Sequence, residues 1–157
     1  MTNPADLDVE LVPVEGVTTA VVKGAVATKD LNSFFDESFG VLGAVLAHQS
    51  VAPTGPAFAR FQGQVEETAV LEVGFPTDRA IEPEGSAEAS TLPAGRVARV
   101  VHAGSFDTLS DGWERLGSWI NAQGLTPTEV FWEAYLTEPT PNPADLRTEL
   151  NWLLEAD

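Results

Sequence analysis

Short apolar segments rich in β-branched residues open the chain, and one long helical segment follows them. Residues 9–14 and 18–24 alternate or run apolar with many Val and Thr side chains, which predicts two strands. From Asp30, the predicted N-cap, to about His48, apolar residues recur at spacings of three, four and seven, which predicts a helix with one buried stripe. The stripe comprises Leu31, Phe34, Phe35, Leu42, Val45 and Leu46. Two more strands are predicted after this helix, at 57–63 and 68–75.

The second half of the chain predicts the same order of elements. Residues 96–103 form a predicted strand, residues 107–123 a predicted helix, and Gly124 lies where a left-handed helix stop is expected. The buried stripe of this helix is predicted to comprise Leu109, Trp113, Leu116 and Ile120. Further predicted strands lie at 87–92, 130–136 and 146–154.

A comparison of the chain with itself at an offset of 74 residues predicts a duplication. Residues 42–54 and 116–128 share five identities over thirteen aligned positions, including the Leu-Gly and Pro-Thr pairs. At the same offset, aromatic residues align with aromatic residues: Phe39 with Trp113, Phe58 with Trp132 and Phe61 with Tyr135. The sequence therefore predicts one domain over residues 1–157, with an internal repeat. Its predicted parts are a first repeat at about 8–76, a connector at about 77–90 and a second repeat at about 91–155.

The predicted fold class is α+β. Each repeat is predicted to be a β-α-β-β module with an antiparallel sheet and one main helix, and one helix cannot cover both faces of such a small sheet. We expect the two modules to pair about a pseudo-twofold axis and to leave a central cleft. Clefts at such junctions are frequent ligand sites.

Composition excludes several classes of function. Twenty-four acidic against eight basic residues give a formal charge of −16, which repels nucleic acid phosphates and anionic membranes, so we expect no direct binding to either. The chain has no cysteine, so thiol chemistry and cysteine-based metal sites are excluded. His48 and His102 lack the spacing of a metal site, and no metal or cofactor is expected. No segment has a signal-peptide or membrane-spanning pattern, and the predicted location is cytoplasmic.

Glu133 is the residue that the predicted fold explains least. In a strand, Phe131, Glu133 and Tyr135 share one face, and Trp132 and Leu136 share the other. We expect Trp132 and Leu136 to pack under the helix, and Phe131 and Tyr135 to flank the carboxylate on the side of the cleft. The residue 74 positions earlier is Ala59, so the fold itself does not require an acid at this place.

Two kinds of partner could compensate for desolvating this carboxylate. An unpaired buried carboxylate costs several kcal/mol or takes up a proton. One alternative is an internal partner such as Arg60, Arg99 or His102. The other is a ligand, either an organic cation or a polar reactive group. A cation about 4 Å away contributes roughly 4 kcal/mol at an effective dielectric of 20, and neighbouring aromatic faces add about 0.5–2 kcal/mol each.

The second half of the chain resembles a known superfamily. The stretch "HAGSF" before a helix, a "W-x-x-L-x-x-W" pattern on that helix, the strand pattern "E-x-Y-L" and a terminal "T-E-L" resemble the GyrI-like small-molecule-binding superfamily. This superfamily includes effector-binding domains of drug-responsive bacterial transcription activators and stand-alone gyrase-inhibitor-like proteins. The resemblance implies two β-α-β-β modules around a central cavity, and it maps the family's ligand-contacting glutamate and tyrosine onto Glu133 and Tyr135. Further ligand-binding side chains are expected to be Phe131, Phe58, Phe61 and Trp113.

Three functions remain open from the sequence. The leading hypothesis is a binding protein for a small hydrophobic, cationic molecule, acting as a sensor in transcription regulation, or as a drug-sequestering or resistance factor in multidrug recognition. The resemblance also permits a hydrolase of reactive cyclopropane-type alkylating compounds, in which Glu133 and Tyr135 are catalytic. The third hypothesis is an acidic interaction module that binds gyrase or a transcription partner.

Overall fold

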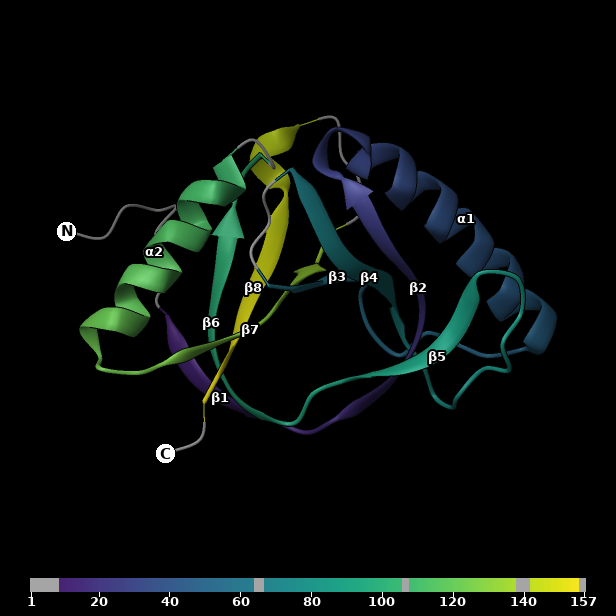
Figure 1. The fold of residues 1–157 in the computed structure, drawn as a ribbon, viewed down its shortest axis with the longest axis horizontal. Coiled ribbons are helices and arrows are strands. Elements are labelled where there is room, and N and C mark those ends of the chain that lie inside the picture. Colours follow the sequence, from purple (N-terminus) through teal and green to yellow (C-terminus); the bar gives the residue numbers. More distant parts are fainter. Residues whose placement is uncertain (1–8, 64–66, 106–107, 138–141, 156–157) are drawn as a thin grey trace. The chain divides into compact units, whose positions relative to one another are not determined.

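A computed structural model describes residues 9–63, 67–105, 108–137 and 142–155 of the chain. Its contacts divide the chain into two compact units (Figure 1). Unit 1 contains Met1–Val14 and Gly95–Asp157, and unit 2 contains Glu15–Ala94.

Unit 2 is an antiparallel sheet of four strands with one long helix. The strands lie in the order β5, β2, β4, β3, because β2 pairs with both β5 and β4, and β4 also pairs with β3. Their bounds are β2 (Val17–Ala27), β3 (Phe58–Gln62), β4 (Thr68–Pro76) and β5 (Ala87–Leu92). A short 3-10 turn, η1 (Thr28–Asp30), leads into the helix α1 (Leu31–Gln49).

The helix of unit 2 covers one face of its own sheet (Figure 1). The rings of Phe39 on α1 and Phe75 on β4 lie 5.5 Å apart in an edge-to-face contact. At Gly24 on β2, a Cβ atom would come within 2.7 Å of the Phe34 ring, so a glycine is needed where the helix approaches the strand this closely. The predicted stripe residues Leu42, Val45 and Leu46 are buried.

Unit 1 has the same arrangement of strands and helix. Its strands lie in the order β1, β6, β8, β7, all antiparallel, and α2 packs against β6. Their bounds are β1 (Glu10–Val14), β6 (Gly95–Ala103), β7 (Pro127–Tyr135) and β8 (Arg147–Leu154), with the helix α2 (Leu109–Ala122) and a 3-10 turn, η3 (Pro143–Asp145).

The core of unit 1 lies between α2 and the sheet. It is formed by Ala98, Val100, Leu116, Ile120, Leu150 and Leu154, with Leu109, Trp113, Trp119 and Trp152 packed at its edge. Gly124 has a φ of 72° and ends the helix region as predicted, with the N–H of Leu125 bonded to the Ile120 carbonyl. The prediction of an α+β fold with antiparallel strands and one main helix in each half is confirmed.

The compact units differ from the predicted repeats by one strand each. The strand β1 precedes β2 in the sequence but pairs with β6, and β5 lies in the predicted connector but pairs with β2. A backbone edge left open by a three-stranded module is thus closed in both units by a strand from outside the β-α-β-β segment. The duplication of the sequence stays a prediction.

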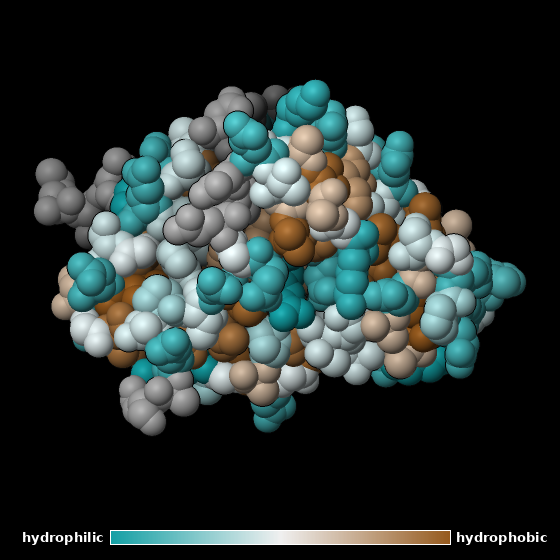
Figure 2. All heavy atoms as spheres, viewed as in Figure 1, coloured by the Kyte–Doolittle hydropathy of each residue, from teal (hydrophilic) through white to brown (hydrophobic). Residues whose placement is uncertain are grey.

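The surface and the helices of the described residues were compared with the patterns of membrane-spanning and metal-binding proteins. On the face shown in Figure 2, hydrophobic residues are interspersed with hydrophilic ones. None of the helices in the described ranges has the length and apolar character needed to span a bilayer. Within the same ranges, no three His, Asp or Glu side chains gather as a potential metal site.

Candidate functional site

The face of β7 that carries Glu133 is the face covered by α2. The ring of Phe131 lies 5.0 Å from that of Trp113 on α2, and Glu133 lies opposite Leu150, a member of the core beneath the helix. Trp132 points to the opposite face and is buried there, whereas Leu136 is 44% exposed. The expectation that Trp132 and Leu136 pack under the helix was therefore wrong. Both faces of this strand are apolar, so alternation fixed which residues share a face but not which face meets the helix.

Two neutral donors hold the carboxylate of Glu133. The indole Nε1–H of Trp113 donates to Oε1 over 3.0 Å, and the hydroxyl of Tyr135 donates to Oε2 over 3.0 Å. Glu133 is half-buried, and desolvation by the surrounding protein raises the pKa of its carboxyl group. The hydrogen bonds from Trp113 and Tyr135, and the nearby His102, oppose this rise without cancelling it.

The same environment further stabilises the neutral phenol of Tyr135. Burial, followed by the charge and the hydrogen bond of Glu133, raises the pKa of the Tyr135 phenol well above its usual value of 10.0. At neutral pH the tyrosine is therefore a hydrogen-bond donor to the carboxylate and has no phenolate form that would compete for a cation.

An aromatic cluster borders the carboxylate. The rings of Trp113, Phe131 and Trp152 lie 5.0–5.9 Å apart in pairs, with tilted or edge-to-face geometry. The register places Trp152 directly opposite Phe131, and the Trp152 indole donates to the carbonyl of Thr128 over 2.8 Å. The strand register, which periodicity does not reveal, brings Trp152 into this cluster.

Polar groups continue the site along the same face. Thr148 lies opposite both Tyr135 and His102 in the strand register. Among the described residues its buried hydroxyl has no hydrogen-bond partner. His102 is buried, and its Nε2 lies 2.8 Å from the Thr108 hydroxyl at the start of α2. This face thus carries one half-buried acid and a set of aromatic rings, with the fully buried Thr148 hydroxyl behind them.

The two arginines considered as internal partners of Glu133 bind other acids. Arg60 lies 3.3 Å from Glu72, and Arg99 lies 3.3 Å from Glu149. Arg99 also donates to Asn151 over 2.7 Å. His102, the third candidate, contributes only a through-space effect on the pKa of Glu133. In the described part of the chain, the hydrogen bonds to Glu133 come from uncharged donors.

Phe58 and Phe61, the remaining predicted ligand residues, belong to unit 2. They are three positions apart on β3, so their side chains lie on opposite faces, and both are buried. Within unit 2 they do not line one common surface. The residues that the structure brings together are therefore Glu133, Tyr135, Phe131 and Trp113.

A half-buried carboxylate beside aromatic rings is an arrangement that can attract an organic cation. The carboxylate carries a charge that its hydrogen-bond donors do not neutralise, and aromatic rings stand beside it. Aromatic faces attract organic cations, and an adjacent carboxylate adds to that attraction.

Comparison with family models identifies the class of protein. The model of the GyrI-like small molecule binding domain matches residues 7–154. The chain belongs to this family. No curated protein sequence matches it significantly.

Solved structures share the fold. The C-terminal domain of EcmrR aligns with a TM-score of 0.83 at 18% identity, covering 95% of this chain and 98% of that domain. In the EcmrR–DNA complex the TM-score is 0.82 at 19% identity, and 94% of this chain spans only 57% of the EcmrR chain.

Two other solved proteins differ in what they bind or do. SAV2435 bound to tetraphenylphosphonium aligns with a TM-score of 0.69 at 12% identity, covering 95% of this chain and 94% of that one. A hydrolase from Listeria innocua has a TM-score of 0.69 at 12% identity, with coverages of 94% and 91%.

Proposed function

We propose that the chain binds a lipophilic organic cation and that Glu133 is its anchor. The observation that carries the proposal is the carboxylate held by the neutral donors Trp113 and Tyr135, with a raised pKa and no charged hydrogen-bond donor among the described residues. A permanent cation placed beside it supplies the missing counter-charge. Membership of a small-molecule-binding family and the tetraphenylphosphonium complex of SAV2435 support the same chemistry.

The aromatic cluster supports a ligand with a large apolar body. Trp113, Phe131 and Trp152 are half-buried, so their rings offer apolar surface next to the charge. Delocalised or bulky cations carry little hydration to lose and fit such a mixed surface. The biological role that follows is that of a ligand sensor or sequestering protein. The EcmrR–DNA complex, whose EcmrR chain is matched over 57% of its length, supports the sensor role.

Calorimetric titration with tetraphenylphosphonium tests the proposal, with neutral triphenylphosphine oxide as the matched uncharged ligand. Glu133→Gln should weaken binding of the cation by about tenfold to a hundredfold, because it removes a Coulomb attraction of roughly 3–4 kcal/mol at an effective dielectric of 20, part of which desolvation offsets. Binding of the neutral ligand should change little. Glu129→Gln is the control, because Glu129 is an exposed acid on the same strand and its removal changes the net charge equally.

Two results would count against the anchor. Equal weakening of cation binding by Glu133→Gln and Glu129→Gln would leave only a diffuse effect of net charge. A loss of affinity for the neutral ligand as large as that for the cation would point to altered packing.

A second candidate function is hydrolysis of a strained electrophile. The raised pKa of Glu133 makes the carboxylate a stronger general base for water, and the Tyr135 hydroxyl beside it can donate a hydrogen bond to an oxygen that gains charge. The fold likeness to a hydrolase from Listeria innocua supports this second candidate. Incubation with a cyclopropane-containing alkylating compound, followed by mass spectrometry, should show a water-added product that disappears in Glu133→Gln. Absence of that product with the wild-type chain rejects the hydrolase and leaves the binding proposal intact.

A further inference from the structure

A hollow lies within unit 2, on the sheet face that α1 does not cover. It has a volume of about 560 Å³, which lies within the range of small-molecule sites. Its charged and polar lining comes from four adjacent strands: Lys23 on β2, Arg60 on β3, Glu72 on β4 and Ser90 on β5. The register places Glu72 directly between Lys23 and Arg60. None of these residues belongs to the Glu133 site.

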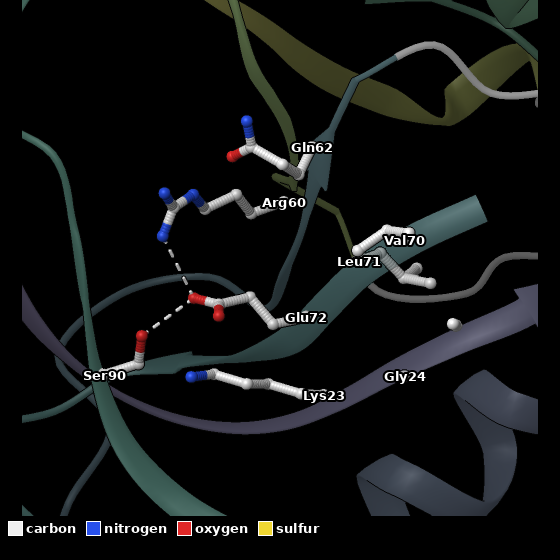
Figure 3. Close-up of a pocket in the computed structure, with 9 residues that line it drawn as sticks. Lys23, Gly24, Arg60, Gln62, Val70, Leu71, Glu72 and Ser90 are labelled. Atoms are coloured by element: carbon white, nitrogen blue, oxygen red, sulfur yellow. Dashed lines mark hydrogen bonds and ion pairs between the residues drawn. The ribbon is translucent and has the colours of Figure 1, made fainter.

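The side chains around this hollow form a charge-balanced network of hydrogen bonds and ion pairs. Glu72 is 8% exposed, and its Oε1 accepts hydrogen bonds from Arg60 Nη1 over 3.3 Å and from the Ser90 hydroxyl over 2.9 Å (Figure 3). Arg60 Nη1 also donates to the Thr91 carbonyl over 3.3 Å. The Nζ of Lys23 lies 2.9 Å from Glu88. The network thus contains two cations and two carboxylates.

Hydrogen-bonding capacity remains unused in this network. Among the described residues, the structure gives no partner to the Nε or Nη2 of Arg60, to Oε2 of Glu72 or to the amide of Gln62. A guanidinium edge with two free N–H groups matches a carboxylate in a bidentate geometry. The free carboxylate oxygen of Glu72 matches an ammonium group.

The equivalent place in unit 1 is an internal comparison. Glu149 occupies the same position on β8, the strand between β6 and β7, as Glu72 does on β4. There the network is closed, because Arg99 donates to Asn151 over 2.7 Å and Asn151 donates to Glu149 over 3.1 Å. Asn151 has no exposed surface. Arg60 and Arg99 each lie 3.3 Å from their glutamate, so the two units differ in the short Arg99–Asn151 bond of unit 1 and in the hollow beside Arg60 in unit 2.

We propose that this hollow binds a small zwitterion with an apolar side chain, such as an apolar amino acid. The carboxylate of the ligand binds Arg60 and Lys23, and its ammonium group binds Glu72. The exposed side chain of Val70, on the same face as Glu72, offers apolar contact to the ligand's side chain. A chain with a formal charge of −16 repels a simple anion, whereas a zwitterion has no net charge and carries both groups that the network can bind.

A matched series of three ligands tests this proposal. L-Leucine carries both charges, 4-methylpentanoate lacks the ammonium group, and 3-methylbutylamine lacks the carboxylate. Titration monitored by amide NMR shifts of the wild-type chain should give a dissociation constant at least about tenfold lower for leucine than for either single-charge analogue. The shifts should centre on Lys23, Arg60, Glu72 and Ser90. Equal affinities for the three ligands, shifts centred elsewhere, or no binding of leucine up to about 10 mM would overturn the proposal.

Variants separate this site from its surroundings and from Glu133. Arg60→Gln and Glu72→Gln should each weaken leucine binding about tenfold or more, while Lys29→Gln, an exposed charge change outside the hollow, should not. Glu133→Gln should also leave leucine binding unchanged, so failure of the cation proposal and failure of this one are distinguishable. If Arg60→Gln does not fold, Arg60→Lys retains the charge and removes the bidentate edge. A leucine affinity that is the same in Arg60→Lys, Glu72→Gln and the wild type would contradict the assignment.

Discussion

Ala59 in unit 2 and Glu133 in unit 1 occupy the same place in two sheets of the same topology. Each lies on the strand that follows the helix, and each faces its own helix, Ala59 opposite Val73 and Glu133 opposite Leu150. Ala59 is completely buried among apolar residues, whereas Glu133 meets an indole N–H and a phenol O–H. The difference teaches that this topology is stable without a carboxylate at that place, so the acid and its two donors need a reason other than folding.

The two donors differ between the units as well. At the offset of 74 residues Trp113 corresponds to Phe39, and Tyr135 corresponds to Phe61. Unit 2 thus has an aromatic ring at each position but neither of the polar groups that hold Glu133. The acid, the indole and the phenol differ together, as expected of a set of residues that acts as one site.

Placing an acid in unit 2 should produce the largest effect. Ala59→Glu buries a carboxylate among apolar residues, without the indole and phenol donors, and should lower the free energy of unfolding by at least about 3 kcal/mol. Urea denaturation measures the change. Ala59→Gln separates the added volume from the added charge and should cost less at neutral pH. An Ala59→Glu variant as stable as the wild type would show that unit 2 also accommodates an acid, which would remove the contrast between the units.

Removing the indole donor should have the next largest effect. Trp113→Phe gives unit 1 the ring found in unit 2 and removes a hydrogen bond to a charged group, so it should destabilise the chain by about 1.5–3 kcal/mol at neutral pH. Part of that cost should disappear at low pH, where Glu133 is protonated. Trp119→Phe, a change of the same size on the same helix, is the control. Equal costs at both tryptophans, with the same pH dependence, would mean that the hydrogen bond contributes nothing specific.

Removing the phenol donor should have a smaller effect. Tyr135→Phe keeps the ring and should cost about 1 kcal/mol, because one hydrogen bond to Glu133 is lost. A double-mutant cycle measures it: in the Glu133→Gln background the cost of Tyr135→Phe should shrink. Identical costs in both backgrounds would show that the hydroxyl does not act through Glu133.

The pH dependence of stability should show the smallest but most specific difference. The folded-state pKa of Glu133 is raised above the ordinary value of 4.5, so the stability that its protonation contributes is complete below pH 4.5 and is lost as the pH rises through the raised pKa. The amide introduced by Glu133→Gln does not titrate. The melting temperature of this variant relative to the wild type should therefore increase between about pH 4 and pH 7. A constant difference, or one that falls with pH, would indicate an ordinary or lowered pKa.

Much of the fold could be predicted from the sequence. Hydrophobic periodicity placed both helices to within about two residues, and the strand at 87–92 matches β5 (Ala87–Leu92). The pairing of β1 with β6 and of β5 with β2 could not be predicted, because strand partners depend on contacts between distant segments. The placement of Trp132 under the helix failed for a related reason: a strand that is apolar on both faces gives no sign of which face the helix covers.

The candidate site was predicted only in part. Glu133 stood out because an acid interrupts an apolar strand, and Trp113 because of its place in the helical stripe. Their hydrogen bond requires the turn of α2 to lie over β7, and periodicity carries no such information. The Arg60–Glu72 network was missed because charges that alternate with apolar residues on a strand are also typical of an ordinary solvent-exposed face.

The pKa of Glu133, measured by carboxyl-detected NMR titration without and with tetraphenylphosphonium, tests the central claim most directly. A pKa above 4.5 in the free chain, lowered when the cation binds, is the predicted result, because the ligand supplies the charge that the indole and the phenol do not. An ordinary pKa that is the same with and without the cation would contradict the account.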